Sequence, residues 1–309
     1  MIIKIFETAL PVLVMIVLGY VCHAKSFIDI RGLQGLKSLI SNITLPVVLF
    51  NAFFCASYSS RTLVLFVVIY TGFGAALAAG FILKRFNKKH ARFMPFLLSG
   101  AEGGMLGYAL YGLITGAQAE FATVDLGQTI FAYTTYLAFL KASDGQQVSA
   151  NLILKNMMTN KCFVGMLLGI IGGASGLGSL LQSSFYGGIY TALTGMIATP
   201  TSAIVLIVVG YELNLKKDLL KPVLKTVLSR VLIMGTLLVL ISFLSTKLFG
   251  FDKDLQVALM ILYALPAPFI IPMFAEVGEE GEYISTTLSV NTLLTLLLFI
   301  GISTYYIAV

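Results

Sequence analysis

Two stretches decide the fold of this chain: Ser99-Gly100-Ala101-Glu102-Gly103-Gly104-Met105-Leu106-Gly107 and Leu265-Pro266-Ala267-Pro268. Both lie within long apolar runs, yet neither is suited to the interior of a helix. The first gathers four glycines around a glutamate, and glycine is a poor helix former. In the second, prolines remove backbone donors, and Pro272 removes a further one soon after. We therefore expect a helix that is interrupted near its middle in both runs.

The runs around these stretches have the length of membrane spans, which need about 20 residues each. Ten apolar runs are predicted as spans: 5–22, 36–56, 62–83, 93–115, 122–140, 162–182, 186–210, 224–249, 255–275 and 284–307. Apolar residues in them are continuous instead of alternating, which predicts helices and not a β-barrel. The first run lacks the cleavage site of a signal peptide, so we expect it to be retained as a span.

The composition agrees with a protein that lies mostly in a bilayer. Of the 309 residues, 58% are hydrophobic and 11% are charged, whereas a soluble domain carries about 25% charged residues. A soluble fold and a disordered chain are therefore excluded. The three cysteines lie near or within apolar runs and do not indicate a disulfide framework. We predict an all-α polytopic membrane protein whose main partner is the lipid bilayer, without a separate soluble domain.

The basic residues predict the orientation. Nearly all Lys and Arg residues lie in, or next to, the loops on one side of the predicted membrane. The exceptions are Lys4, Arg61, Lys247 and Lys253. Because positively charged loops stay in the cytoplasm, both termini are predicted to lie outside a cytoplasmic membrane. The loop 276–282 is acidic although it belongs to the cytoplasmic side. The net charge of +6 is thus a topology signal and does not indicate a nucleic-acid partner.

Ten spans divide at the polar linker 141–161 into two halves of five, 1–140 and 162–309. An odd number of spans in each half predicts that the halves are inverted relative to each other. Corresponding spans carry Pro46 and Pro200, which alone are also explained as simple kinks. The two interrupted spans, the fourth and the ninth, also correspond. We expect two inverted five-helix repeats whose interrupted helices cross.

Other glycines have a simpler interpretation, because small residues let membrane helices pack closely. One such small-residue run comprises Gly165, Gly169 and Gly173. We expect this run to serve helix packing and not ligand binding.

Interrupted helices expose backbone groups that cannot face lipid, so these groups must line a cavity or bind a ligand. An N-terminal half-helix end attracts anions. No Lys or Arg is predicted in the middle of a span, so we expect no buried cationic side chain at the substrate. The predicted substrate-binding residues are Asn51, Gly103, Gln128, Thr199, Ala267 and Pro268.

Two acidic residues within spans are the predicted ion-coupling groups. Glu102 lies at the interruption of the fourth span, and a carboxyl at this depth is costly and commonly functional. Our hypothesis is that Glu102 takes up a proton or binds a cation during transport. The alternative is a structural carboxyl that accepts hydrogen bonds from its own loop. Asp125 shares a helical face with Gln128 and Thr135, and is either an ion-coupling residue or a helix N-terminal acid favoured by the dipole.

The coupling ion is expected to be H⁺ or Na⁺. No cofactor and no metal site is predicted, because no residues show the spacing of metal ligands. His23 and His90 lie in loops, and no nucleophile–base arrangement is recognisable, so an enzyme is the least expected class.

In these motifs the chain resembles the auxin efflux carrier family, which includes plant PIN exporters and bacterial malate or malonate permeases. Residues 103–110 are similar to the family's Asn-Thr-Gly-Phe-x-Gly-x-Pro-Leu stretch in the fourth span, and residues 264–276 to its ninth-span crossover and exit. The pairs and short runs Leu45-Pro46, Asp125-Leu126-Gly127-Gln128 and Val209-Gly210 also fit. Two positions depart from the pattern, since Glu102 replaces the crossover asparagine and Ala109 the following proline.

The resemblance implies the fold of sodium/proton antiporters and bile-acid transporters. Spans 1, 2, 6 and 7 would form a scaffold, and spans 3–5 and 8–10 a transport domain that moves like an elevator. The resemblance also suggests a homodimer. It predicts a permease for a small organic anion, a mono- or dicarboxylate, bound where spans 4 and 9 cross. Since a negative Glu102 repels carboxylates, an anionic substrate requires a protonated Glu102.

Two other functions stay open. A cation/proton antiporter of the same fold would exchange ions at Glu102 and Asp125. A non-transporting membrane sensor or partner-bound subunit is the third interpretation.

Overall fold

The computed structural model describes residues 2–86, 88–143, 149–269, 271, 275 and 277–308, and every regular element within these ranges is helical. The α-helices are α1 (Ile2–Ala24), α2 (Ile30–Leu39), α3 (Leu45–Phe54), α4 (Ser60–Leu83), α5 (Met94–Leu98), α6 (Tyr108–Thr115), α7 (Ala119–Phe131), α8 (Leu137–Ser143), α9 (Ala150–Thr159), α10 (Lys161–Ala174), α11 (Leu177–Ser183), α12 (Gly187–Tyr211), α13 (Leu220–Phe249), α14 (Lys253–Ala264) and α16 (Gly281–Ala308). Three π-helical segments are η1 (Ile40–Thr44), η4 (Gly103–Gly107) and η5 (Ala132–Tyr136). Short 3₁₀ turns are η2 (Lys84–Phe86), η3 (Lys88–His90), η6 (Lys217–Leu219) and η7 (Gly278–Glu280).

Several helices have the length and apolar composition needed to cross a membrane. Five continuous helices in the described ranges do: Ile30–Phe54, Ser60–Leu83, Gly187–Tyr211, Lys217–Phe249 and Gly278–Ala308. The pair α10 and α11, bent by 75°, makes a sixth when it is taken as one span. Their outward side chains are apolar, as in Leu232 and Val239 of α13, which are 71% and 68% exposed. Such side chains are suited to contact with lipid, so the all-helical fold is compatible with a membrane protein.

Each of the ten predicted spans contains helical residues in the structure. The boundaries differ by a few residues for most spans. The second span starts earlier than predicted, at Ile30 with α2, and continues through η1 into α3. The number of membrane crossings and the inverted repeat stay predictions.

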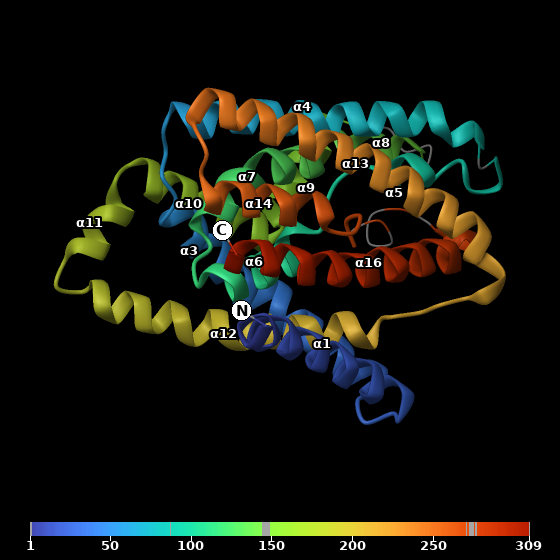
Figure 1. The fold of residues 1–309 in the computed structure, drawn as a ribbon, viewed down its shortest axis with the longest axis horizontal. Coiled ribbons are helices and arrows are strands. Elements are labelled where there is room, and N and C mark those ends of the chain that lie inside the picture. Colours follow the sequence, from blue (N-terminus) through green and yellow to red (C-terminus); the bar gives the residue numbers. More distant parts are fainter. Residues whose placement is uncertain are drawn as a thin grey trace.

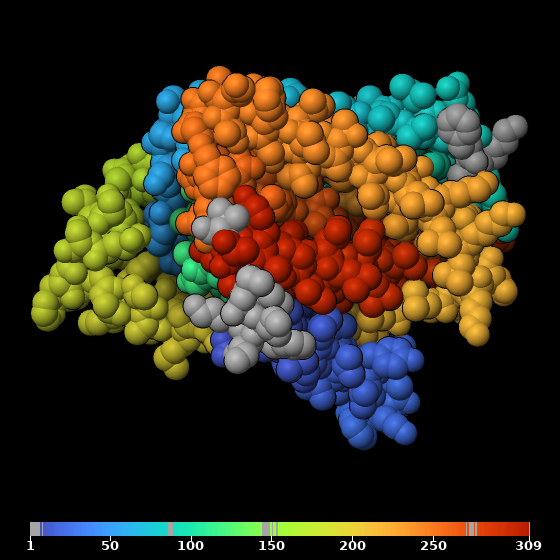
Figure 2. Space-filling view, in the orientation of Figure 1, coloured from blue at the N-terminus to red at the C-terminus, as the bar shows by residue number. Residues whose placement is uncertain are grey.

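The helices are arranged in layers (Figure 1). The long helices α4 and α13 lie along one side, α1 and α12 lie along the opposite side, and α6, α14 and α16 lie between them. At one end, α11 and the beginning of α12 project from the rest of the molecule, as the space-filling view shows (Figure 2).

Close packing of α10 against α3 depends on a stripe of glycines. A methyl group added at Gly165, Gly169 or Gly173 would lie 2.5–2.6 Å from a backbone carbonyl oxygen of α3. Any larger side chain would therefore push the two helices apart. This contact confirms that the glycine run serves helix packing.

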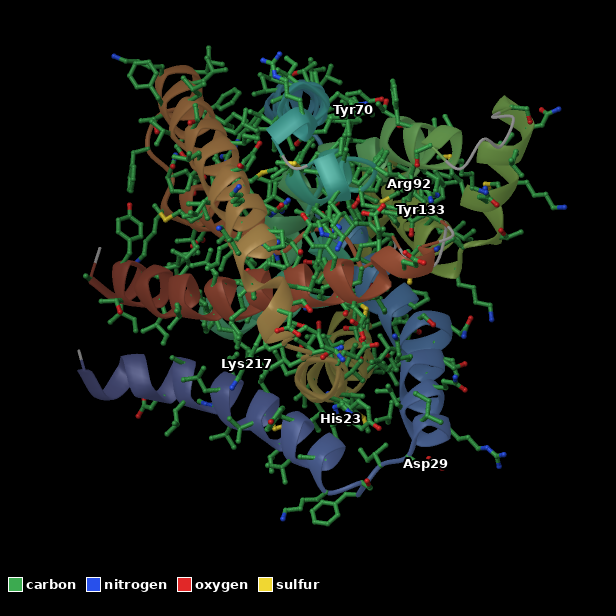
Figure 3. All side chains as sticks on the ribbon, turned by 90° about the vertical axis from the view of Figure 1, so that its right-hand side faces the viewer. His23, Asp29, Tyr70, Arg92, Tyr133 and Lys217 are labelled. Atoms are coloured by element: carbon green, nitrogen blue, oxygen red, sulfur yellow. The ribbon has the colours of Figure 1, made fainter. Side chains whose placement is uncertain are left out.

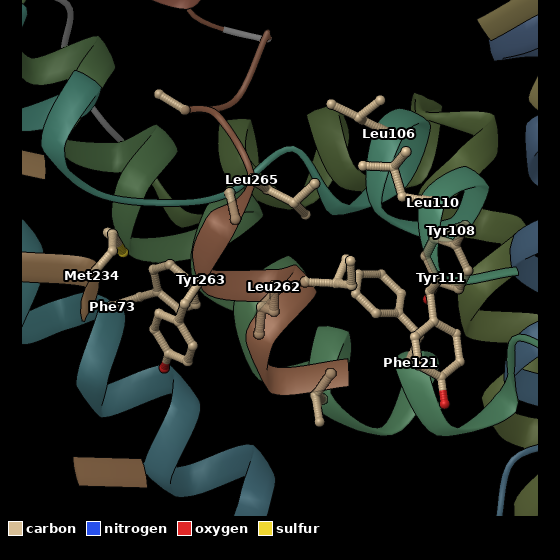
Figure 4. Packing of buried hydrophobic residues seen from close by; sticks show 14 of the residues in the cluster. Phe73, Leu106, Tyr108, Leu110, Tyr111, Phe121, Met234, Leu262, Tyr263 and Leu265 are labelled. Carbon is tan, nitrogen blue, oxygen red and sulfur yellow. The ribbon is translucent and has the colours of Figure 1, made fainter. Parts of the chain in front are cut away.

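An apolar core surrounds the place where the chain is interrupted (Figure 4). On one side, the ring of Phe73 from α4 stacks on Tyr263 of α14, with centroids 5.4 Å apart. On the other side, Phe121 of α7 contacts the rings of Tyr108 and Tyr111 of α6. These buried aromatic residues fix the ends of α6 and α14 relative to α4 and α7.

Candidate functional site

The two predicted interruptions are both present. In the fourth span, α5 ends at Leu98, and the chain is extended at Ser99 before η4 begins at Gly103. Gly100 has a φ of +71°, and a methyl group there would lie 2.7 Å from the Pro268 ring, so this position favours glycine for two reasons. In the ninth span, α14 ends at Ala264 and Leu265 is extended. The predicted role of Pro272 lies outside the described residues.

The interruptions meet, and Glu102 joins them. Its backbone N–H donates to the carbonyl oxygen of Pro266 over 3.0 Å. The side chain is 8% exposed. Its Oε1 accepts from the N–H of Met105 (3.3 Å), in the segment that follows in its own span, and its Oε2 accepts from the N–H of Phe269 (2.6 Å), beyond the break in the other. One carboxyl group therefore occupies the backbone donors of both interrupted spans.

The carbonyl groups on the other side of the breaks are bound by Arg230 of α13, which is 3% exposed. Its guanidinium donates to the carbonyl oxygen of Leu97 (3.1 Å) at the end of α5, to that of Gly100 (2.7 Å), and to that of Leu265 (2.9 Å) just after α14. The expectation that no Lys or Arg lies in the middle of a span is therefore wrong.

The reason for this error is the position of a helix boundary. The sequence places Arg230 near the cytoplasmic end of the eighth span, whereas α13 already begins at Leu220. At 3.6 residues per turn, Arg230 lies about three turns inside the helix.

Asp125 also lies inside its helix, because α7 begins at Ala119. Its interpretation as a helix N-terminal acid is therefore wrong. The side chain is 1% exposed, and Oδ2 accepts from the hydroxyl of Thr129 over 2.9 Å. Oδ1 lies close to the Tyr108 hydroxyl but accepts no hydrogen bond of good geometry from the described residues. A methyl group at Gly103 would overlap with Oδ1, so Asp125 packs directly against the start of η4.

A cavity of about 150 Å³ lies beside the crossing. Four of the predicted site residues line it together: Glu102, Asp125, Gln128 and Pro268. Gln128 also donates a hydrogen bond to the carbonyl oxygen of Ala101. No Lys, Arg or His is found among the described residues of the lining, so the two carboxyl groups dominate its electrostatics. A water molecule takes about 30 Å³, so this volume suits a small solute.

All three π-helical segments border this cavity. Ser41 of η1, Met105 of η4 and Tyr133 of η5 contribute to its lining. Figure 3 shows Tyr133 among the helices, whereas Asp29 lies at the periphery near the α1–α2 connection. Because π-helical turns are rare and concentrate at functional sites, their positions support this cavity as the functional site.

The structure separates the remaining predicted site residues from this cavity. Asn51 and Thr199 line another cavity, of about 530 Å³, between α3, α12 and the α6–α7 connection. There Asn51 Oδ1 accepts a hydrogen bond from the hydroxyl of Tyr190 over 2.8 Å. Gly103 and Ala267 are buried at the crossing itself and do not line either cavity.

Comparison with known proteins gives no match, either to a family model or to a curated protein. The resemblance to auxin efflux carriers therefore stays a prediction from motifs.

Proposed function

We propose that this protein is a secondary active transporter, a permease for a small organic anion such as a mono- or dicarboxylate, coupled to protons through Glu102. The observation that carries the proposal is the position of the Glu102 carboxyl group, which accepts hydrogen bonds from Met105 and Phe269 of the two interrupted spans. Converging backbone donors of this kind bind carboxylates. Glu102 thus occupies the place that a carboxylate substrate would take.

Competition for these donors provides a coupling mechanism. An ionised carboxylate only accepts hydrogen bonds, and both oxygens of Glu102 are engaged as acceptors. When Glu102 binds a proton, it loses its negative charge and part of its acceptor capacity, and the N–H groups of Met105 and Phe269 become available. A substrate carboxylate then binds there. Proton and anion enter the site together, which makes the transport of a monocarboxylate electroneutral.

The packing of the helices supports two inverted repeats. The two helix pairs that pack together most extensively are α3 with α10 and α1 with α12. The first pair consists of spans 2 and 6, and the second pair of spans 7 and 1. Spans 2 and 7 are counterparts in the two halves, as are spans 6 and 1, so one pair corresponds to the other. The pairs α4 with α7 and α13 with α16 are related in the same way. This pattern supports ten spans in two related halves of five, and the odd number of spans in each half makes the halves inverted.

The same packing supports a scaffold of α1–α3 and α10–α12 and a transport domain of α4–α8, α13, α14 and α16. The crossover cavity lies between the two groups, with Leu45 and Phe163 on the scaffold side and Glu102 and Asp125 on the other. The cavity with Asn51 and Thr199 lies between the same two groups. We infer that the crossing faces one cavity in this state and the other cavity after an elevator-like movement.

Contacts between loops support the predicted orientation. They also explain why the loop 276–282 is acidic although it is predicted to lie on the basic, cytoplasmic side. Glu282 pairs with Lys216 over 3.0 Å, and Glu280 lies 3.5 Å from His90. The Glu282–Lys216 ion pair thus joins the acidic loop after the ninth span to a basic loop of the predicted cytoplasmic side, and the contact of Glu280 with the neutral His90 ring joins it to a second one. Both termini then lie outside.

One observation favours cation/proton antiport as a second candidate function. The crossover cavity contains the carboxyl groups of Glu102 and Asp125 without a described basic residue in its lining, and Oδ1 of Asp125 lacks a well-placed donor. Such a site attracts cations.

Uptake into proteoliposomes tests the proposal. With an inside pH of 7.5 and an outside pH of 5.5, the wild-type protein should accumulate a labelled carboxylate, up to about 100-fold for one proton per anion. Glu102→Gln should bind the anion at pH 7.5 as well as the wild type does at pH 5.5, and should exchange it without accumulating it. Glu282→Gln, whose carboxyl group is exposed, is the control and should behave as the wild type.

Three outcomes would contradict the proposal. Unchanged accumulation and affinity in Glu102→Gln would remove the coupling role of this residue. Proton release driven by a sodium or lithium gradient, without carboxylate uptake, would establish the antiporter instead. A lack of flux with a broad carboxylate panel and with cations would favour a non-transporting sensor.

A further inference from the structure

Arg230 is a buried cation whose partners are backbone carbonyl groups. Its guanidinium binds Leu97, Gly100 and Leu265, and among the described residues no carboxylate forms an ion pair with it. A buried charge inside a membrane protein needs compensation. Here the compensation comes from the two interruptions, because Leu97 lies in the last turn of α5, Gly100 follows two residues after its end, and Leu265 follows directly after α14.

Two helix C-termini that meet in this way form a site for a positive charge. Each end carries a partial negative charge and carbonyl groups without an intrahelical partner. In broken-helix transporters such ends coordinate cations. In this protein one guanidinium nitrogen lies 2.7 Å from the oxygen of Gly100 and 2.9 Å from the oxygen of Leu265. The positive charge therefore sits between the two helix ends.

We propose that Arg230 takes the place of a monovalent metal cation at the carbonyl ends of the crossing, so that the wild-type protein binds no sodium there. The planar guanidinium suits this position because its donors form a fixed fork that reaches both interrupted spans at once. By holding Gly100 and Leu265 together, Arg230 also keeps Glu102 close to Pro266, its backbone partner. Arg230 is thus a positioning residue with a permanent charge.

This inference deepens the proposed function, and rests on it, by excluding these carbonyls as the site of a coupling sodium ion. Its test measures cation binding and needs no substrate. The thermal unfolding of purified protein in detergent is compared in sodium chloride, potassium chloride and N-methylglucamine chloride at equal ionic strength. The variants are Arg230→Ala, which opens space at the carbonyls, Arg230→Lys, which keeps a charge, and Arg230→Met, which fills the space without a charge.

We expect the Tm of Arg230→Ala to be at least about 3 °C higher in sodium or potassium chloride than in N-methylglucamine chloride, after any difference seen with the wild type is subtracted. Arg230→Lys and Arg230→Met should not gain it, because the space is filled. If Arg230→Ala folds and shows no such gain, the proposal is overturned. If Arg230→Ala does not fold, Arg230→Lys should be clearly more stable than Arg230→Met, and equal stabilities would overturn the proposal.

Transport measurements separate this inference from the proposed function. A wild-type protein that moves no carboxylate would defeat the proposed function, whereas the cation-dependent unfolding of Arg230→Ala would still support the role of Arg230. Normal proton-driven uptake by the wild type, together with no cation effect in Arg230→Ala, would leave the proposed function and overturn the role of Arg230.

Discussion

Glu102 combines the two roles that its sequence context left as alternatives. It is a structural carboxyl, because Oε1 accepts from Met105 in its own loop. It also reaches Phe269 across the crossing, which its own loop cannot explain. A residue that holds two interrupted spans together through its charge is well placed to release them when that charge is neutralised. The structural contact is therefore what makes the proposed coupling work.

The close approach of Asp125 to η4 gives a test at a single residue. A methyl group at Gly103 would overlap with Asp125 Oδ1, whereas at Gly104 the nearest atoms are 4.0 Å away. Gly103→Ala should therefore destabilise the protein by about 1–3 kcal/mol through overpacking, and Gly104→Ala should be nearly neutral. Chemical or thermal unfolding in detergent measures both. Equal stabilities of the two variants would show that Asp125 does not pack against Gly103.

At the scale of elements, the connection before α5 is tied to the start of α16 through His90. The imidazole is buried and stacks on the ring of Tyr283, with centroids 3.7 Å apart. Burial, with a further contribution from Lys89, lowers the pKa of His90 below its ordinary value of 6.5. The folded protein therefore disfavours the protonated imidazole more than the unfolded chain does. Stability linked to His90 is present above pH 6.5 and is lost as the pH falls below it.

This linkage predicts the behaviour of His90→Phe, which keeps an aromatic ring on Tyr283 but does not titrate. Its Tm should fall less than that of the wild type between pH 7.5 and pH 5.5. Glu280 lies 3.5 Å from His90, and burial raises the pKa of its carboxyl group, so both proteins are compared in a Glu280→Gln background, in which this group does not titrate. A Tm loss that is the same in both proteins would show that His90 does not titrate in this pH range.

For the whole molecule, the proposed movement between scaffold and transport domain can be blocked by a cross-link. Leu45 of α3 approaches Gly104, where an added methyl group would lie 4.0 Å from Leu45 Cδ2. In a background with Cys22, Cys55 and Cys162 replaced by Ala, the pair Leu45→Cys and Gly104→Cys should stop transport when joined by a short reversible thiol cross-linker. Reduction should restore it, because only the relative movement of the two groups is prevented.

The control cross-link joins two residues of the proposed scaffold. The rings of His23 in α1 and Tyr211 in α12 lie 4.7 Å apart, so His23→Cys with Tyr211→Cys should be cross-linked without loss of transport. Full transport by the cross-linked Leu45→Cys and Gly104→Cys protein would exclude an elevator-like movement between these groups.

The sequence allowed the prediction of those features that depend on local chemistry. Pro266, Pro268 and the glycines around Glu102 prevent a regular helix wherever the chain runs, so both interruptions were predictable. The role of Arg230 was not, because it depends on where α13 begins and on which face meets α5 and α14. The separation of Asn51 from Gln128 also depends on packing, since spacing within a span gives no information about neighbouring spans.

If the protein works as the proposed transporter, the balance of charge at the crossing has a consequence for its transport cycle. A carrier that relied on its cargo to neutralise exposed helix ends would be held back whenever it was unloaded, and would be confined to strict exchange. Here Glu102 and Arg230 supply both counter-charges from within the chain. Under the proposed function, the protein without substrate is thereby suited to return to its starting state on its own, which allows net transport of solute in one direction.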